Sequence, residues 1–124
     1  LLVDDNVVNQ KLASAMLTRL HLTFDVASNG QEAVDMSAAH PYALVLMDME
    51  MPVLDGISAT RAIRTRERAA VPNSHLPIIA MTANALQEDR ERCMAAGMDG
   101  YIAKPVNLRT LQSELQRVGS LGLA

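Results

Sequence analysis

The strongest constraint on the fold is the alternation of short apolar runs with amphipathic stretches along the chain. Three runs, at 1–3, 43–47 and 78–81, contain no polar residue. Strands with this pattern are covered on both faces, which is typical of a parallel sheet. The run at 22–27 alternates apolar and polar residues and suits an edge strand, and a fifth run lies at 101–103. We therefore predict five strands in one parallel sheet.

The stretches between these runs carry helical periodicity. Apolar residues recur every fourth position in the first stretch and at three- and four-residue spacing in the last, so each helix can bury one face. These positions are Val8, Leu12, Met16 and Leu20, and then Leu108, Leu111, Leu115 and Val118. Helix starts are marked by good N-cap residues, namely Asn6, Asn29, Asp55 and Asn107. Gly97 marks the end of the fourth helix.

Five strands that alternate with five helices predict a doubly wound α/β fold with right-handed crossovers. Such sheets place their functional sites at the carboxyl ends of the strands. The 124 residues fit a single domain. We place this domain at residues 1–118, with 119–124 as a C-terminal tail or linker. Because the chain opens inside an apolar run without an initiator Met, we expect it to be one domain of a longer protein.

Composition argues against several classes of function. Aromatic residues make up 2% of the chain, so platforms for stacking nucleic-acid bases are scarce, and a formal net charge of −3 offers no basic field for DNA. Four arginines, Arg61, Arg64, Arg66 and Arg68, lie at helical spacing, which predicts a solvated helix face. No apolar run approaches the roughly 18 residues of a membrane span. The single cysteine, Cys93, suits a reducing cytoplasm.

Polar residues follow four of the predicted strands at their carboxyl ends. They are Asp4 and Asp5, Asp48, Thr82 and Lys104. Three carboxylates at one edge of a sheet repel one another unless a cation lies between them. Mg²⁺ binds oxygen ligands and usually keeps several waters beside one or two carboxylates. We therefore predict a magnesium site with Asp5 and Asp48 as ligands, Asp4 acting through a water, and a main-chain carbonyl just past Asp48.

The other residues at this edge suit phosphoryl chemistry. Lys104 supplies a compact positive charge and Thr82 a hydroxyl donor, which are the groups that stabilise phosphoryl oxygens during transfer. Asp48 can act as the nucleophile, as carboxylates do in aspartyl-phosphate chemistry. A single strand-end carboxylate would suit a helix cap or a loop. Four strand ends that all supply such groups instead predict one phosphoryl-accepting site.

Four motifs in this order resemble those of response-regulator receiver domains, and the resemblance spans nearly every residue. The motifs lie at 2–6, 46–56, 81–84 and 101–105. The resemblance implies a flavodoxin-like fold with strand order 2-1-3-4-5. It also implies that Asp48 receives the phosphoryl group. Mg²⁺, with Mn²⁺ as an alternative, would be bound by Asp5, Asp48 and the main-chain carbonyl of Glu50, while Asp4 supports a metal-bound water.

The same resemblance implies a conformational switch. The Thr82 hydroxyl would move toward the phosphoryl group and Tyr101 would turn inward, which changes the face formed by the fourth helix, the fifth strand and the fifth helix. Thr82 and Lys104 would contact the phosphoryl oxygens, and Ala83 would keep the site accessible. A cis bond before Pro105 would aim the lysine into the site.

The motifs at 3–9 and 81–85 look like those of receivers fused to hybrid sensor histidine kinases. This subtype implies a domain that catalyses its own phosphorylation and dephosphorylation within a longer kinase. The implied partners are the phosphodonor domain of a histidine kinase, a histidine phosphotransfer domain, or both, and no nucleic acid. The domain would lie in the cytoplasm and outside the membrane, also where the parent protein is a membrane-anchored sensor.

Three alternatives stay open at this point. Asp48 and Glu50 echo the nucleophile and acid of haloacid-dehalogenase-like phosphatases, although that family places its nucleophile on the first strand and usually has a longer chain. A flavodoxin-like electron carrier would share the fold, but it needs a hydroxyl- and Gly-rich phosphate loop where residues 4–6 are acidic and amidic. A pseudo-receiver that only binds a partner would not need the intact set of acceptor, metal and phosphoryl-contacting residues.

Overall fold

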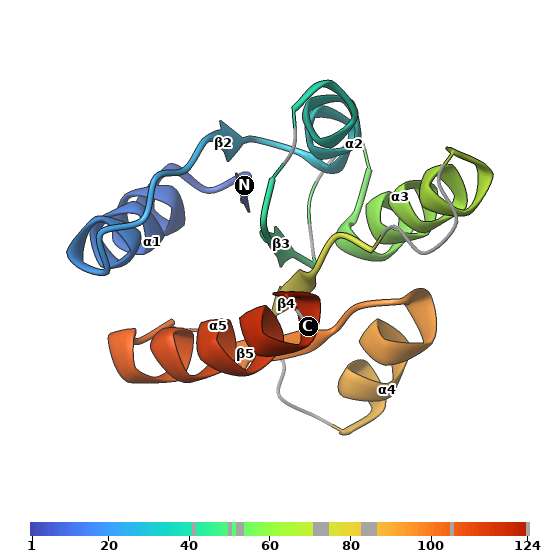
Figure 1. Cartoon of the computed structure of the whole chain (residues 1–124). Helices are drawn as coiled ribbons and strands as arrows, with labels where there is room; N and C mark the ends of the chain where they lie inside the picture. The colour runs from blue at the N-terminus through green and yellow to red at the C-terminus, as the bar shows by residue number, and fades with distance from the viewer. Residues whose placement is uncertain are drawn as a thin grey trace.

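Strands and helices alternate along the chain, as predicted (Figure 1). The structure is a computed structural model that describes residues 1–40, 42–49, 51, 54–70, 75–82, 87–104 and 106–123. In chain order the elements are β1 (Leu2–Val3), α1 (Val7–Arg19), β2 (Val26–Ala27), α2 (Gly30–Ala39), β3 (Val45–Asp48), α3 (Gly56–Ala70), β4 (Ile78–Thr82), α4 (Gln87–Ala96), β5 (Gly100–Ala103) and α5 (Leu108–Leu123).

The strands form one parallel sheet in the order β2-β1-β3-β4-β5, which confirms the predicted fold class and topology. The second strand is shorter than the apolar run at 22–27 suggested. Within the described residues it pairs with β1 over two positions, Leu2 with Val26 and Val3 with Ala27, and the Asp25 carbonyl just before it accepts the Leu2 N–H at 2.9 Å. The alternating pattern of a half-buried strand therefore covers more residues than the strand that pairs with β1.

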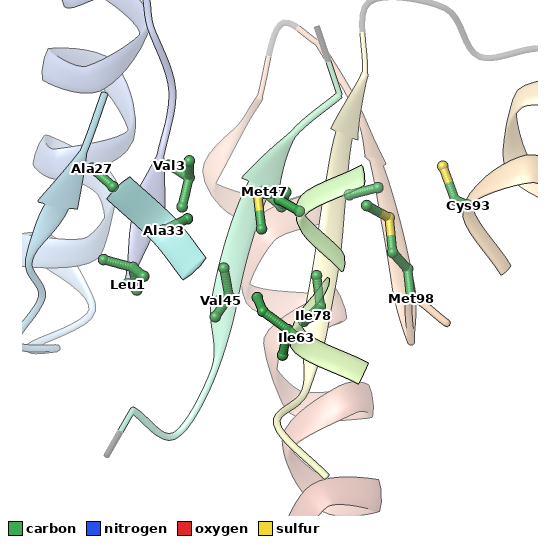
Figure 2. Packing of buried hydrophobic residues seen from close by; sticks show 12 residues of the cluster. Leu1, Val3, Ala27, Ala33, Val45, Met47, Ile63, Ile78, Cys93 and Met98 are labelled. Atoms are coloured by element: carbon green, nitrogen blue, oxygen red, sulfur yellow. The ribbon is translucent and has the colours of Figure 1, made fainter. Parts of the chain in front are cut away.

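Helices cover both faces of the sheet, with α1 and α5 on one side and α2, α3 and α4 on the other (Figure 1). Successive residues of a strand point to opposite faces, so Val45 and Met47 join the cluster under α2 and α3 while Leu46 packs under α1 and α5. Figure 2 shows the first cluster, in which Ile63 of α3 lies against Val45 and Ile78. Burying each of these side chains stabilises the fold by about 1.5–3 kcal/mol.

Helix α1 turns a different face to the sheet than the sequence predicted. Its buried residues are Ala13 and Leu17, whereas Val8 and Leu12 are 66% and 49% exposed. A spacing of four residues advances by about 400° around a helix, so a row drawn at that spacing drifts by about 40° per step. The row of apolar residues at this spacing therefore packs on the sheet at Leu20, but it faces solvent at the beginning of the helix.

The predicted helix caps are present in the structure. Asn6, Asn29, Asp55 and Asn107 each accept hydrogen bonds from backbone N–H groups in the first turn of the following helix. Gly97 ends α4 with a φ of +107°, a conformation that costs glycine little. These local signals placed the helix starts correctly.

Helix α5 ends later than predicted, because its backbone continues through residues 119–123, where the sequence suggested a tail. The glycines there lower helix propensity by about 1 kcal/mol each, which is not enough to stop a helix that is already formed. The domain boundary at residue 118 stays a prediction. Even with this extension, no helix in the part of the chain that the structure describes is long and apolar enough to cross a bilayer.

The prediction that the arginines near residue 64 form a solvated face is wrong for Arg64. Its side chain is 7% exposed and lies between α3, the start of β4 and the loop after α4. Arg64 Nε donates to the Gly97 carbonyl at 2.8 Å, and its terminal nitrogens contact Glu67 Oε1 at 2.7 Å and Asp99 Oδ2 at 2.9 Å. Arg61 and Arg68 are exposed, as predicted.

The two carboxylates that pair with Arg64 are also bonded to the backbone at the start of β4. Glu67 accepts a hydrogen bond from the Leu76 N–H, and Asp99 Oδ2 accepts one from the Ile78 N–H at 2.9 Å. His75 Nε2 lies 2.6 Å from the other oxygen of Asp99. We call this group the Arg64 network, which comprises Arg64, Glu67, His75 and Asp99. Periodicity did not predict it because Arg64 and Glu67, on the buried face of α3, bind polar partners from other parts of the chain.

Candidate active site

The predicted site residues lie together at one edge of the sheet, at the carboxyl ends of β1, β3, β4 and β5. Asp48 and Thr82 are the last residues of β3 and β4, while Asp4 and Lys104 directly follow β1 and β5. Backbone bonds hold these ends in register, since the Lys104 N–H donates to the Thr82 carbonyl at 2.7 Å. The parallel topology thus explains why residues 44 or more positions apart in sequence, such as Asp4 and Asp48, become neighbours.

Three carboxylates converge at this edge, as the sequence predicted. One oxygen from each of Asp4, Asp5 and Asp48 lies within 4.8 Å of the others. Asp4 and Asp48 are buried, with 1% and 3% of their surface exposed, whereas Asp5 is exposed. The cluster therefore opens to solvent on the side of Asp5, where a ligand can enter.

Lys104 is the cation of this cluster. Its Nζ donates to Asp48 Oδ1 at 2.9 Å and lies 3.4 Å from Asp4 Oδ2. Burial alone would lower the pKa of Lys104, but the hydrogen bond and the attraction from Asp48, together with the charge of Asp4, outweigh it and raise the pKa above its ordinary value. Lys104 consequently stays charged throughout the physiological range.

The charge balance of the cluster favours a divalent metal ion. Three carboxylates face one ammonium group, so negative charge remains in excess. All of the donor atoms are hard oxygens, and one carboxylate is exposed, which suits an ion that binds few protein ligands and keeps several waters. The residues present therefore fit Mg²⁺.

A glycine at the start of α3 lies close to the backbone of Asp48. A Cβ atom added to Gly56 would lie 2.3 Å from the Asp48 carbonyl oxygen, so only glycine permits this approach. The Gly56 N–H donates to the Met49 carbonyl at 3.2 Å. Glycine at position 56 therefore allows the start of α3 to lie against the end of β3.

Two further predicted site residues lie on β4 and β5. Thr82 is buried at the end of β4, and Tyr101 is half-buried on the neighbouring strand, packed against the cluster under α2, α3 and α4. Three other residues named from the resemblance, Glu50, Ala83 and Pro105, lie outside the described residues. The roles of all these side chains stay predictions.

Asn6 has a second role that its position before α1 alone does not predict. Besides capping α1, Asn6 donates its backbone N–H to Asp4 Oδ1 at 2.9 Å, which forms a small turn around Asp5. An Asp two residues before a helix cap commonly accepts such a bond, so the spacing of Asp4 and Asn6 was a usable signal. The turn directs the other oxygen of Asp4 toward Lys104.

Comparison with known proteins agrees with this geometry. The family model described as "Response regulator receiver domain" matches residues 1–116. Histidine kinase 5 of Arabidopsis thaliana is 45% identical over 94% of this chain, and hybrid signal transduction histidine kinase B of Dictyostelium discoideum is 42% identical over 86%. The matches span only 15% and 6% of those two proteins.

Solved structures support the same assignment. The receiver domain of a sensor histidine kinase from Pseudomonas aeruginosa, with a magnesium ion in its active-site cleft, is 47% identical with a TM-score of 0.84, and the match covers 96% of this chain and 94% of that one. The receiver domain of Ssk1 from Saccharomyces cerevisiae, crystallised with the histidine phosphotransfer protein Ypd1, is 32% identical with a TM-score of 0.89, covering 97% and 87%.

These matches do not favour the phosphatase or the pseudo-receiver alternative, and they supply no support for a flavin carrier. The fold, the strand order and the acidic edge agree with the family over nearly the whole chain. The chain therefore belongs to the response regulator receiver family, the phosphoryl-accepting domains of two-component phosphorelays.

Proposed function

We propose that Asp48 accepts a phosphoryl group from a phosphohistidine partner beside a bound Mg²⁺ ion. Asp5, Asp48 and the main-chain carbonyl of Glu50 would hold the ion, and Asp4 would act through a metal-bound water. The observation that carries this proposal is the convergence of three carboxylate oxygens within 4.8 Å, with Lys104 Nζ 2.9 Å from Asp48.

The chemistry required of the chain is a single in-line transfer. A carboxylate oxygen of Asp48 forms the new O–P bond as the N–P bond to the donor imidazole breaks. Lys104 is already in contact with Asp48, so its ammonium group can stabilise the negative charge that develops on the phosphoryl oxygens. The Thr82 hydroxyl would donate to another of these oxygens. When bound, Mg²⁺ neutralises the charge that two anionic groups share at close approach.

Incubation with Mg²⁺ and labelled acetyl phosphate tests this assignment. We expect an acid-stable, alkali-labile adduct on the wild-type domain and none on Asp48→Asn. The matched control is Asp35→Asn, an exposed carboxylate on α2 that should leave labelling unchanged. Equal labelling of wild type and Asp48→Asn would contradict the proposal, and fast multiple turnover of many phosphoesters would favour a phosphatase.

We propose that Thr82 and Tyr101 transmit the effect of phosphorylation to the face formed by α4, β5 and α5. Support comes from their positions on adjacent strands, since Ala80 pairs with Tyr101 and Thr82 pairs with Ala103. A charge added at Asp48 would bias two positions of the Thr82 hydroxyl and thereby two packings of Tyr101. Beryllofluoride should shift backbone amide resonances of β5 in wild type. Thr82→Ala should weaken that response, and an undiminished response would contradict the proposal.

We propose a histidine phosphotransfer protein as partner, docked on the first turns of α1. Val7, Val8 and Leu12 are 60%, 66% and 49% exposed there. Leu12 also lines a small cavity of about 30 Å³ together with Asp4 and Lys104, so this apolar surface borders the acidic cluster. The similar Ssk1 receiver is complexed with such a protein, which supports the choice of partner.

Separate donors distinguish docking from chemistry. Leu12→Gln should slow transfer from a phosphorylated histidine phosphotransfer protein several-fold but leave labelling by acetyl phosphate unchanged. The control is Leu22→Gln, a similarly exposed leucine beyond the far end of α1. If Leu22→Gln slowed protein-dependent transfer as much as Leu12→Gln, the surface on α1 would not be the docking site.

We propose that the chain is the receiver of a hybrid sensor histidine kinase that acts in the cytoplasm. The plant and amoebal relatives, which are histidine kinases much longer than their matched segments, support this setting. Immunodetection with an antibody to this domain in fractionated cells should reveal a protein several times the domain's mass. Detection of the free domain alone would contradict the proposal.

A further inference from the structure

The peptide group that joins Asp4 to Asp5 is held by a residue outside the family motifs. The side-chain amide of Gln10 on α1 donates from Nε2 to the Asp4 main-chain carbonyl at 2.5 Å. The Asp4 N–H, which belongs to the preceding peptide group, donates to the Ala27 carbonyl of β2 at 3.1 Å. Gln10 therefore ties the end of β1 back to the first turns of the helix that follows it.

This contact matters because Asp5 depends on the backbone for its position. Asp4 is buried and fixed through the Asn6 N–H and Lys104. In the part of the chain that the structure describes, the exposed carboxylate of Asp5 has no hydrogen bond or ion pair of its own. The orientation of the Asp4–Asp5 peptide plane therefore helps to set the backbone from which the Asp5 carboxylate extends.

Without Gln10, the Asp4 carbonyl would need a different donor. The peptide could then rotate to expose this oxygen to water, which would carry the Cα of Asp5 with it and increase the spread of positions available to its carboxylate. We propose that Gln10 is a positioning residue for the metal site, and that its amide keeps Asp5 aimed at the ion; this inference rests on the proposed function. Groups that orient metal ligands commonly change metal affinity by about 10–100-fold when removed.

Magnesium titration of Gln10→Leu, which keeps the size of the side chain but lacks the donor, tests the proposal. We expect the dissociation constant for Mg²⁺, measured by calorimetry, to rise about tenfold. Gln10→Glu should show at least the same loss, because an ionised carboxylate cannot donate to the carbonyl. The control is Gln31→Leu, which removes a comparable amide that contacts Asp35 on the surface of α2 and should leave the constant unchanged.

A spectroscopic readout identifies the route of the effect. The ¹⁵N resonance of the Asp5 amide shares a peptide group with the Asp4 carbonyl, so it should shift in Mg²⁺-free Gln10→Leu and Gln10→Glu but not in Gln31→Leu. Wild-type affinity in both Gln10 variants would overturn the inference alone, as would weaker binding without a shift at Asp5. Absence of Mg²⁺ binding by the wild type would instead overturn the proposed metal site, and the role of Gln10 with it.

Discussion

The amino ends of the parallel strands form one edge of the β-sheet, the amino edge, and their carboxyl ends form the other, the carboxyl edge. Charged side chains are paired differently at these two edges. At the amino edge, the guanidinium of Arg64 pairs with Glu67 and Asp99, and both carboxylates also accept backbone N–H groups from the start of β4. At the carboxyl edge, three carboxylates lie together, and within the described residues the Lys104 ammonium contacts two of them, those of Asp48 and Asp4. At the amino edge both carboxylates bind the guanidinium and a backbone N–H group, whereas the carboxyl edge includes the exposed Asp5 and leaves room for a cation from solution.

This difference separates stability from function within one small sheet. Buried charges that are fully paired hold elements together but leave no coordination position for a ligand. Carboxylates that repel one another cost stability in the free protein, and a metal ion can recover that cost on binding. We therefore expect substitutions at the amino edge to change unfolding, and substitutions at the carboxyl edge to change metal binding.

The largest expected effect is the loss of Arg64. Arg64→Met leaves the buried Glu67 and the half-buried Asp99 without the guanidinium, which should lower the free energy of unfolding by about 3–5 kcal/mol. Urea denaturation measures this change, and Arg68→Met on the exposed side of α3 should stay within about 0.5 kcal/mol of wild type. Under conditions where Arg64→Met is folded, its Mg²⁺ dissociation constant should match that of wild type. A large change in this constant would show that the two edges are coupled.

The next effect in size is the loss of a metal ligand at the other edge. Asp5→Asn should weaken Mg²⁺ binding by about 10–100-fold, which corresponds to about 1.4–2.7 kcal/mol. Calorimetric titration measures the constant, and Asp35→Asn on α2 should bind Mg²⁺ as the wild type does. Unchanged affinity in Asp5→Asn would remove Asp5 from the ligand set and leave Asp48 as the main protein ligand.

Without Mg²⁺, the same chemical change should have opposite signs at the two edges. Asp5→Asn relieves repulsion between carboxylates within 4.8 Å of one another and should stabilise the protein by about 1 kcal/mol at low salt. Asp99→Asn loses a charged partner of Arg64 and should destabilise it by at least about 1 kcal/mol. Urea midpoints in a chelating buffer measure both. Addition of salt should reduce the gain in Asp5→Asn because that site is exposed, and a destabilised Asp5→Asn would contradict the proposed repulsion.

The fold was predictable because its signals are local and repeated. Unbroken apolar runs indicated a parallel sheet, and caps such as Asn6 and Asn107 marked helix starts. Parallel topology then placed Asp48 and Lys104 at one edge without any knowledge of side-chain contacts. The face of α1 was less predictable, since Val8 and Leu12 follow an apolar spacing but have turned away from the sheet.

Contacts between distant polar residues could not be predicted in the same way. Arg64 lies on α3 and Asp99 just before β5, and no periodicity connects their positions. Gln10 reaches a backbone carbonyl, which has no signature in sequence at all. Polar residues that satisfy one another inside a protein look like surface residues when they are read singly, so the amino edge of the sheet became visible only in three dimensions.

The smallest expected effect lies where the amino edge meets solvent. Glu114 on α5 accepts from Arg117, whose guanidinium also donates to the Asp99 carbonyl at 3.1 Å, and from the Tyr101 N–H. The hydrogen bond from Arg117, aided by Tyr101 and opposed by burial, lowers the pKa of Glu114 below its ordinary value of 4.5. The stabilisation from ionised Glu114 is therefore present above pH 4.5 and is lost as the pH falls through the lowered pKa.

Comparison of Glu114→Gln with wild type isolates this contribution. The variant should be less stable at pH 7 by only a few tenths of a kcal/mol, because Arg117 is largely exposed and such pairs are screened by solvent. Urea midpoints at pH 7 and pH 3 should show the difference shrinking toward zero at the lower pH. A difference that grew on acidification would reverse the sign of the linkage. A loss of stability as large as that of Arg64→Met would instead show that the Arg64 network extends to the surface of α5, with Glu114 as a strongly stabilising member.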